Sequence, residues 1–235
     1  DNIMTVRTKL NTAIFLVIGA FLILMGGLVY SAITAITLKD LTVTTERAVT
    51  AMYRVTDSTK EIIVSDVDLE RQTQEWESAI DEFNSVLGSL DKHAGTEIIS
   101  GALQTQITRT RNVWDVSTNR FVQAQQQLQA IIDDETLPDF RKVGLHRMLS
   151  FARDDENGKL EFQIAQLIST LRSFDLAGKD LVVQNLGKVS RGVEQQTEEL
   201  TQTSFTIVGV AAVVVIAIAI LFVLGFTRGL AKRIT

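Results

Sequence analysis

Arginine is the residue type in this sequence that is best suited to binding a small charged solute. A guanidinium presents paired N–H donors that fit a carboxylate, the anionic group of amino acids and organic acids. Three arginines, Arg109, Arg111 and Arg120, fall in one predicted helix after Thr96. More basic residues fall in the short helix predicted next: Arg141, Lys142, Arg147 and Arg153. These arginines are candidate ligand-binding residues. The alternative, which surface statistics favour, is that they pair with nearby acidic residues on exposed faces.

No group of residues has the spacing of a catalytic or metal centre. The two histidines, His93 and His146, are isolated, and cysteine is absent. The sequence has no H-E-x-x-H motif, no glycine-rich phosphate loop and no favourable Ser/His/Asp arrangement. The acidic segment 154–158 lacks the spaced ligands of a calcium loop, so we predict a solvated turn there. We therefore predict that the chain is not an enzyme and uses no cofactor or metal.

Two long apolar stretches lie near the ends of the chain. No charged residue occurs from Ala13 to Ile36 or from Phe205 to Phe226. A helix needs roughly 20 apolar residues to cross a membrane, so we predict transmembrane helices over residues 12–36 and 205–226. A buried core helix is the alternative for either stretch, and a cleaved signal peptide is a second alternative for the first. The first stretch is longer than the apolar part of a signal peptide, and no clear cleavage site follows it, so we expect an uncut anchor.

The charges beside these stretches predict the topology. Basic residues flank both stretches on the side of the chain termini: Arg7 and Lys9 before the first, and Arg228, Lys232 and Arg233 after the second. Basic residues close to membrane spans stay in the cytoplasm. Residues 1–11 and 227–235 are therefore predicted to be cytoplasmic, and residues 37–204 to lie outside the inner (cell) membrane of a bacterium.

The predicted outer region is acidic. It contains 27 of the 28 acidic residues and 18 of the 23 basic ones, a net charge of −9. This balance gives no support to nucleic-acid binding. Membrane lipid is the partner that the apolar stretches require.

The outer region is predicted to be all-α. It is rich in Gln, Glu, Leu, Ile, Val and Thr and has one proline, Pro138, which is typical of helical bundles. From Leu38 onward, mostly apolar residues recur at alternating steps of three and four, the pattern of a coiled-coil helix. We predict one continuous helix from the membrane to about Asp91. Its stripe is Leu38, Leu41, Thr45, Ala48, Met52, Val55, Thr59, Ile62, Asp66, Leu69, Thr73, Trp76, Ile80, Phe83, Leu87 and Leu90.

Three more outer helices are predicted after this one. Gly95 is expected to end the first helix, with Thr96 as the N-cap of the second. A short third helix is predicted from about Pro138 to Arg153. The stripe of the second helix is Leu103, Ile107, Thr110, Trp114, Ser117, Phe121, Ala124, Leu128 and Ile131.

The fourth predicted helix is long and changes phase along its length. The apolar pattern slips by about half a turn near Gly178, which indicates local unwinding or a packing adjustment. The stripe before the slip is Leu160, Ile164, Leu167, Leu171 and Phe174, and the stripe after it is Val182, Leu186, Val189, Val193 and Leu200.

An even number of outer helices returns the chain to the membrane. The predicted fold is therefore a membrane-anchored antiparallel helical bundle with very long first and fourth helices. Near the membrane only these two helices are present, and two amphipathic helices cannot bury both of their faces alone. We expect a second copy to complete a four-helix stalk as a parallel homodimer. The alternative is a monomer with a pairwise stalk.

One polar position of the first stripe, Asp66, leaves two alternatives open. A carboxylate in a helical core needs a partner, since otherwise its pKa rises. Asp66 either pairs with an arginine in the core, which would set the register of the helices, or is only partly buried.

Both ends of the chain resemble a known family. The segment from Val6 to Ile33 (VRTKLNTAIFLVIGAFLILMGGLVYSAI) resembles the first transmembrane helix of bacterial chemoreceptors and related sensor kinases, in which a basic R-x-K-L precedes an aliphatic run. The segment from Ile218 to Thr235 (IAILFVLGFTRGLAKRIT) resembles the second transmembrane helix entering a HAMP linker. The region between them has the size of a four-helix-bundle ligand-binding domain.

The resemblance implies a transmembrane signal receptor for a small solute or a periplasmic protein. A displacement of the second transmembrane helix would reach cytoplasmic signalling proteins through a HAMP region and an output domain beyond Thr235. In this family, ligands at the subunit interface are usually bound by arginines of the first outer helix, which adds Arg47 and Arg54 to the candidates. The alternative function is a membrane-anchored coiled-coil scaffold, and the segment that follows Thr235 would separate the two.

Overall fold

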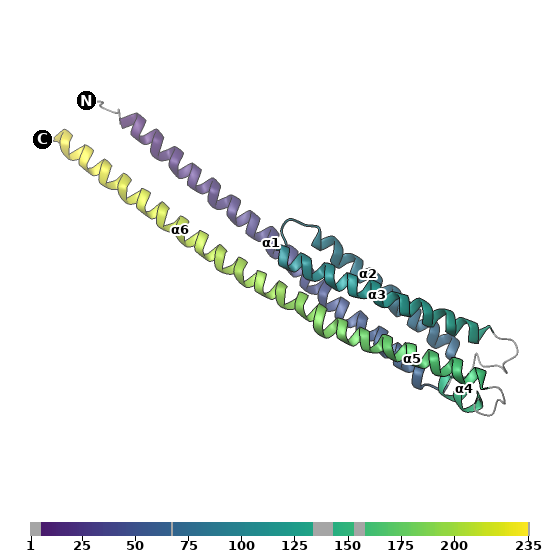
Figure 1. Cartoon of the computed structure of the whole chain (residues 1–235). Coiled ribbons are helices and arrows are strands. Elements are labelled where there is room, and N and C mark those ends of the chain that lie inside the picture. The colour runs from purple at the N-terminus through teal and green to yellow at the C-terminus, as the bar shows by residue number, and fades with distance from the viewer. Residues whose placement is uncertain (1–5, 67, 134–142, 153–157, 235) are drawn as a thin grey trace. The chain divides into compact units, whose positions relative to one another are not determined.

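The computed structural model describes residues 6–66, 68–133, 143–152 and 158–234 (Figure 1). The protein is all-helical in these ranges, as the composition predicts. The chain divides into two compact units, residues 1–38 with 195–235, and residues 39–194. In chain order the elements are α1 (Val6–Val64), α2 (Leu69–Ala94), α3 (Gly101–Ile132), α4 (Leu145–Ala152), α5 (Lys159–Asp180), the π-helix η2 (Leu181–Leu186) and α6 (Gly187–Ile234).

The first unit contains the apolar part of α1 and most of α6. Both helices are long and apolar enough to cross a membrane, and the most apolar window of each has no buried residue. The side chain of Phe15, for example, is 75% exposed. Among the described residues, the helices of this unit contact each other at the following positions. The hydroxyls of Ser31 and Ser204 share a hydrogen bond of 2.5 Å, and the Cγ2 of Ile207 lies 3.6 Å from where a Cβ on Gly27 would be.

The predicted stripes form the core of the second unit. Every position of the first stripe from Leu41 to Leu90 is buried except Asp66. In α3 the whole stripe is buried, apart from Phe121, which is half-buried. The side chains that the repeat of three and four residues predicts to be in the interior are therefore buried. Burial of apolar side chains is the main source of stability for such helices.

The prediction of one continuous helix as far as Asp91 is wrong. α1 ends at Val64, α2 begins at Leu69, and contacts join the two helices. Arg54 pairs with Glu82, and Trp76 donates a hydrogen bond to Thr59. Residue numbers rise along one helix as they fall along the other, so α2 runs back beside α1.

The turn between α1 and α2 depends on an aspartate. Asp68 has left-handed backbone angles (φ 55°, ψ 56°) and is the N-cap of α2, where its carboxylate accepts a hydrogen bond of 3.2 Å from the Arg71 N–H. Aspartate tolerates this conformation and caps helices well. Asp66, in the same turn, is 64% exposed at its side chain and pairs with His146 at 3.4 Å. The prediction that Asp66 pairs with an arginine in the core is therefore wrong.

The second turn follows the prediction in part. α2 ends at Ala94 with Gly95 as its C-cap. The N-cap of α3 is Ser100 rather than Thr96, because the Ser100 hydroxyl accepts the Leu103 N–H. The Thr96 hydroxyl instead donates a hydrogen bond to the His93 carbonyl.

The remaining elements complete the second unit. α4 falls within the predicted third helix, whose first part, including Pro138, lies outside the described residues, as do residues 154–157 of the predicted solvated turn. α3 packs against α2 and α5, and α4 packs against α5. The predicted phase slip is confirmed: a π-helix at Leu181–Leu186 follows Gly178 by three residues.

Candidate functional site

The structure describes six of the eight candidate arginines. Arg141 and Arg153 lie outside the described residues, as does Lys142. Arg54 pairs with Glu82 at 2.5 Å, and Arg111 pairs with two aspartates. Four others are exposed, and no ion pair between described residues includes them: Arg47, Arg109, Arg120 and Arg147. The arginines thus share no partner, and their ligand-binding role stays a prediction.

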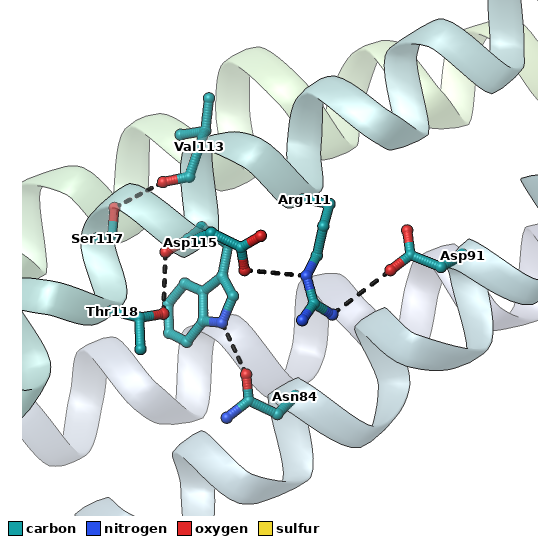
Figure 2. A network of polar contacts seen from close by, with 8 residues as sticks. Asn84, Asp91, Arg111, Val113, Asp115, Ser117 and Thr118 are labelled. Carbon is teal, nitrogen blue, oxygen red and sulfur yellow. Dashed lines mark hydrogen bonds and ion pairs between the residues drawn. The ribbon is translucent and has the colours of Figure 1, made fainter.

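Arg111 lies at the centre of a polar network between α2 and α3 (Figure 2). Its Nε donates to Asp115 one turn further along α3 at 2.9 Å, and its Nη1 donates to Asp91 on α2 at 3.4 Å. One side of the guanidinium fork is therefore used within the helix and the other across to the neighbouring helix. In this arrangement Arg111 positions α3 against α2, and an anionic ligand would have to displace a carboxylate to reach it.

The Asp91 carboxyl of this network has a raised pKa, chiefly because it is partly buried. Partial burial raises the pKa of the Asp91 carboxyl above its usual value of 3.8; Arg111 opposes this effect, and the nearby negative charge of Asp115 adds to it. A carboxyl with a raised pKa binds its proton more tightly in the folded than in the unfolded chain. Its stabilising contribution is therefore complete below pH 3.8 and is lost as the pH rises through the folded-state pKa.

This balance gives the first prediction. Replacing Arg111 with glutamine should raise the pKa of Asp91 further, because the cation that opposes the burial effect is lost. The pH midpoint of the Asp91 carboxyl resonance, followed by NMR in the full chain, measures this change. Arg109→Gln is the matched control, since Arg109 is on the same helix and in none of the described ion pairs. Equal midpoints in the two variants would contradict the assignment of Arg111 as the opposing charge.

An aromatic cluster holds the helices of the second unit together beside this network. Trp114 stacks edge-on against Phe83 at 4.6 Å between ring centroids, and its indole N–H donates to Asn84 at 2.7 Å. Phe174 of α5 lies 5.9 Å from the rings of both Trp114 and Trp76. Such tilted and edge-to-face pairs add to the stability gained from burial alone. The cluster therefore links α2, α3 and α5 through side chains from each.

Sequence reasoning missed a buried carboxylate next to this cluster. Asp175 is 9% exposed, and its Oδ2 accepts a hydrogen bond of 2.5 Å from the Lys179 Nζ, with which it forms an ion pair. Its Oδ1 is buried without a hydrogen-bond partner among the described residues. The available signal was the acidic residue directly after a stripe phenylalanine with a lysine four positions later, a spacing that brings side chains together on a helix.

Positive charge from α1 also faces Asp175. The pKa of Lys60 is raised, first by its hydrogen bond to Asp57 and also by the charges of Asp57 and Asp175, while desolvation lowers it. One helical turn after Asp175, α5 approaches α1 closely at Gly178. A Cβ on Gly178 would lie 2.5 Å from the Met52 Cε and 2.9 Å from the Thr56 Cγ2. A side chain at this position would force Met52 and Thr56 to shift.

The Arg111 network and the aromatic cluster join helices through charge and packing, and Asp175 and Lys179 form an ion pair within α5. No group of three or more His, Cys, Asp or Glu residues within the described ranges could hold a metal ion. A hollow along α6 is lined by Glu198, Thr201, Gln202, Phe205 and Thr206, all on that helix. One helix alone does not enclose a ligand, so this hollow is no candidate pocket.

Known proteins add no further information on this arrangement. No protein-family model, curated protein or solved structure matches the chain.

Proposed function

We propose that this chain is a transmembrane signal receptor similar to a bacterial chemoreceptor. Its outer helical region would sense a small solute or a partner protein and relay a helix displacement to a cytoplasmic HAMP-like region. The observation that carries this proposal is connectivity. Both apolar stretches are continuous in helix with the second unit, the first through α1 and the second through α5, η2 and α6.

The proposed architecture is a membrane-anchored antiparallel bundle that pairs as a parallel homodimer in the inner membrane, with both termini in the cytoplasm. The order of contacts between α1 and α2 supports the antiparallel arrangement. Exposed apolar side chains of the second unit support a partner surface: Tyr53 and Val64 on α1, Val116 on α3, and Phe162 and Leu176 on α5.

The relay would act through the two helices that leave the second unit. α5 contacts α1 at Gly178. α6, which continues the helix after α5 and η2, contacts α1 in the first unit, where Ser31 and Ser204 share a hydrogen bond. A ligand that binds one packing arrangement of α5 against α1 more tightly increases the population of that arrangement. A shift of α6 along α1 would then change the Ser31–Ser204 contact.

A disulfide across this contact tests the proposal. The chain, which has no native cysteine, is joined after Thr235 to the HAMP and signalling rod of a chemoreceptor, and Ser31→Cys is combined with Ser204→Cys. Their hydroxyls are 2.5 Å apart, so the two thiols can reach disulfide geometry. We expect oxidation to link the positions within one chain and to hold the rod's kinase output at one level, and reduction to release it.

The matched control combines Ser31→Cys with Gln202→Cys. Gln202 is exposed and lies two residues from Ser204, about 200° around the helix, so no link within one chain should form. A kinase output that is identical in the oxidised and reduced proteins, despite a complete link, would refute the receptor and favour a scaffold. Failure of the link to form would refute the helix contact on which the relay depends.

A further inference from the structure

The helix that joins the second unit to the second apolar stretch contains one residue more than a regular α-helix would place between two of its buried positions. Up to the first residue of the π-helix, apolar or small buried residues follow steps of three and four: Ile164, Leu167, Leu171, Phe174, Gly178 and Leu181. From Asn185 onward, the buried residues are Asn185, Leu186, Val189 and Val193. Among the buried aliphatic residues whose side chains the structure describes, the step from Leu181 to Leu186 is five, one more than an α-helix allows on one face. A π-helix, with its i→i+5 hydrogen bonds, accommodates this step.

The side chains on both sides explain why the π-helix forms here. If α-helix continued from Leu181, the next inward positions would be Asn185, Lys188 and Gly192 in place of three aliphatic residues. Burying Leu186, Val189 and Val193 is far more favourable than burying a lysine and exposing them. The surplus residue is therefore required by the burial pattern, and the backbone accepts the poorer π geometry to satisfy it.

The surroundings of the π-helix also make this part of the helix easy to deform. Gly178, Gly187 and Gly192 lie within fifteen residues of helix, and each glycine weakens a helix relative to alanine. Asp175, three residues before Gly178, has a buried carboxylate oxygen without a partner among the described residues. Weak helical turns and unsatisfied groups favour local opening over rigid displacement.

We infer that Leu181–Leu186 is the yielding segment of the helix that runs from the aromatic cluster toward the second apolar stretch. Its surplus residue lets the helix change its length and rotation locally, while the buried side chains on either side stay packed in the core. In a receptor, this segment would determine how much of a displacement of α5 reaches α6. That consequence rests on the proposed function, whereas the surplus residue and the weakness of the segment do not.

Removal of one residue tests the structural part. Gln184 is exposed within the π-helix, and deleting it leaves a step of four from Leu181 to the following leucine, which an α-helix satisfies. The matched control deletes Ser169, an exposed residue within α5, which rotates the neighbouring stripe positions by about 100° out of the core. Both deletions are made in the full chain in lipid nanodiscs and followed by hydrogen exchange and thermal unfolding.

In the parent chain we expect the amides of residues 181–187 to exchange about tenfold faster than those of 167–174, as for a weakly protected segment. Deleting Gln184 should abolish this difference and leave the melting temperature equal or higher. Deleting Ser169 should lower it. Equal exchange rates of the two segments in the parent, or rapid exchange that persists without Gln184, would overturn the inference.

The signalling part is read in the receptor–rod fusion. There, deleting Gln184 should change the rod's kinase output, because the helix no longer absorbs displacement. An unchanged output with slowed exchange would remove the role in signal control and leave the receptor intact. The receptor itself fails only if the Ser31–Ser204 disulfide also leaves the output unchanged.

Discussion

Replacing Trp76 with alanine is expected to destabilise the second unit by about 3–5 kcal/mol, the usual cost of removing a large buried aromatic side chain. Trp76 is fully buried, with its ring 4.8 Å from that of Phe121 and 5.9 Å from that of Phe174. It also donates a hydrogen bond of 2.8 Å to the buried Thr59 hydroxyl. Alanine would leave a cavity among three helices and remove the donor that joins α2 to α1.

Urea unfolding of the full chain, followed through tryptophan fluorescence, measures this loss, since Trp114 still reports unfolding in the Trp76 variants. Trp76→Phe separates the two contributions, because it keeps a ring in the cluster and removes only the N–H donor and part of the volume. We expect it to cost about 1–2 kcal/mol. Ser78→Ala, at an exposed position of the same helix, should have almost no effect. Similar midpoints for Trp76→Ala and Ser78→Ala would show that the aromatic cluster does not hold the unit together.

The second large effect is expected at Gly144. A Cβ there would overlap the carbonyl oxygen of Ser65 and lie 2.5 Å from the Ser65 carbonyl carbon and 2.9 Å from that of Asp66. These atoms belong to the backbone of the turn that follows α1, so they cannot rotate away as a side chain could. Gly144→Ala should therefore cost about 3 kcal/mol, at the upper end of the range for overpacking.

Gly88→Ala is the matched control for this variant. Gly88 lies within α2, and nothing lies within 4 Å of the position that its Cβ would take. Alanine should stabilise the helix there by about 0.5–1 kcal/mol. Thermal unfolding of both variants measures the opposite signs. A Gly144→Ala protein as stable as the parent would mean that the segment before α4 does not pack against the turn.

These two sites illustrate what periodicity captures and what it omits. The stripe from Leu41 to Leu90 is buried almost without exception, because a seven-residue repeat identifies the face of a helix that must leave water. The same repeat passes unbroken through Asp66, where the chain reverses. Both helices of the hairpin face one core, so their phase carries over the turn, and the pattern contains no information about direction.

The signal for that turn was present but local. Ser65, Asp66 and Asp68 are residues that favour turns and N-caps over helix interiors. The prediction took only Gly and Pro as residues that end a helix, so it did not place a turn at these residues. The phase slip near Gly178 shows the opposite case, because an interruption of the period itself is visible in the sequence and appears in the fold as a π-helix.

The candidate arginines were chosen for their chemistry, and their partners depend on tertiary structure. Nothing in the sequence pairs Arg111 with Asp91, twenty residues away, or Arg54 with Glu82; these contacts arise once α2 folds back on α1 and α3 packs on α2. The buried Asp175 was missed for a related reason: its spacing to Lys179 indicates a pair of charges on one helix, but its burial depends on how the neighbouring helices pack.

The sequence by itself determined the helical class, the two apolar helices and the faces that become buried, because each follows from the composition and the period of a single segment. Only the tertiary structure decided where the first outer helix turns back, which charges meet and which carboxylate is enclosed. These features depend on which helices become neighbours, and that choice is made by the combined packing of side chains from several segments.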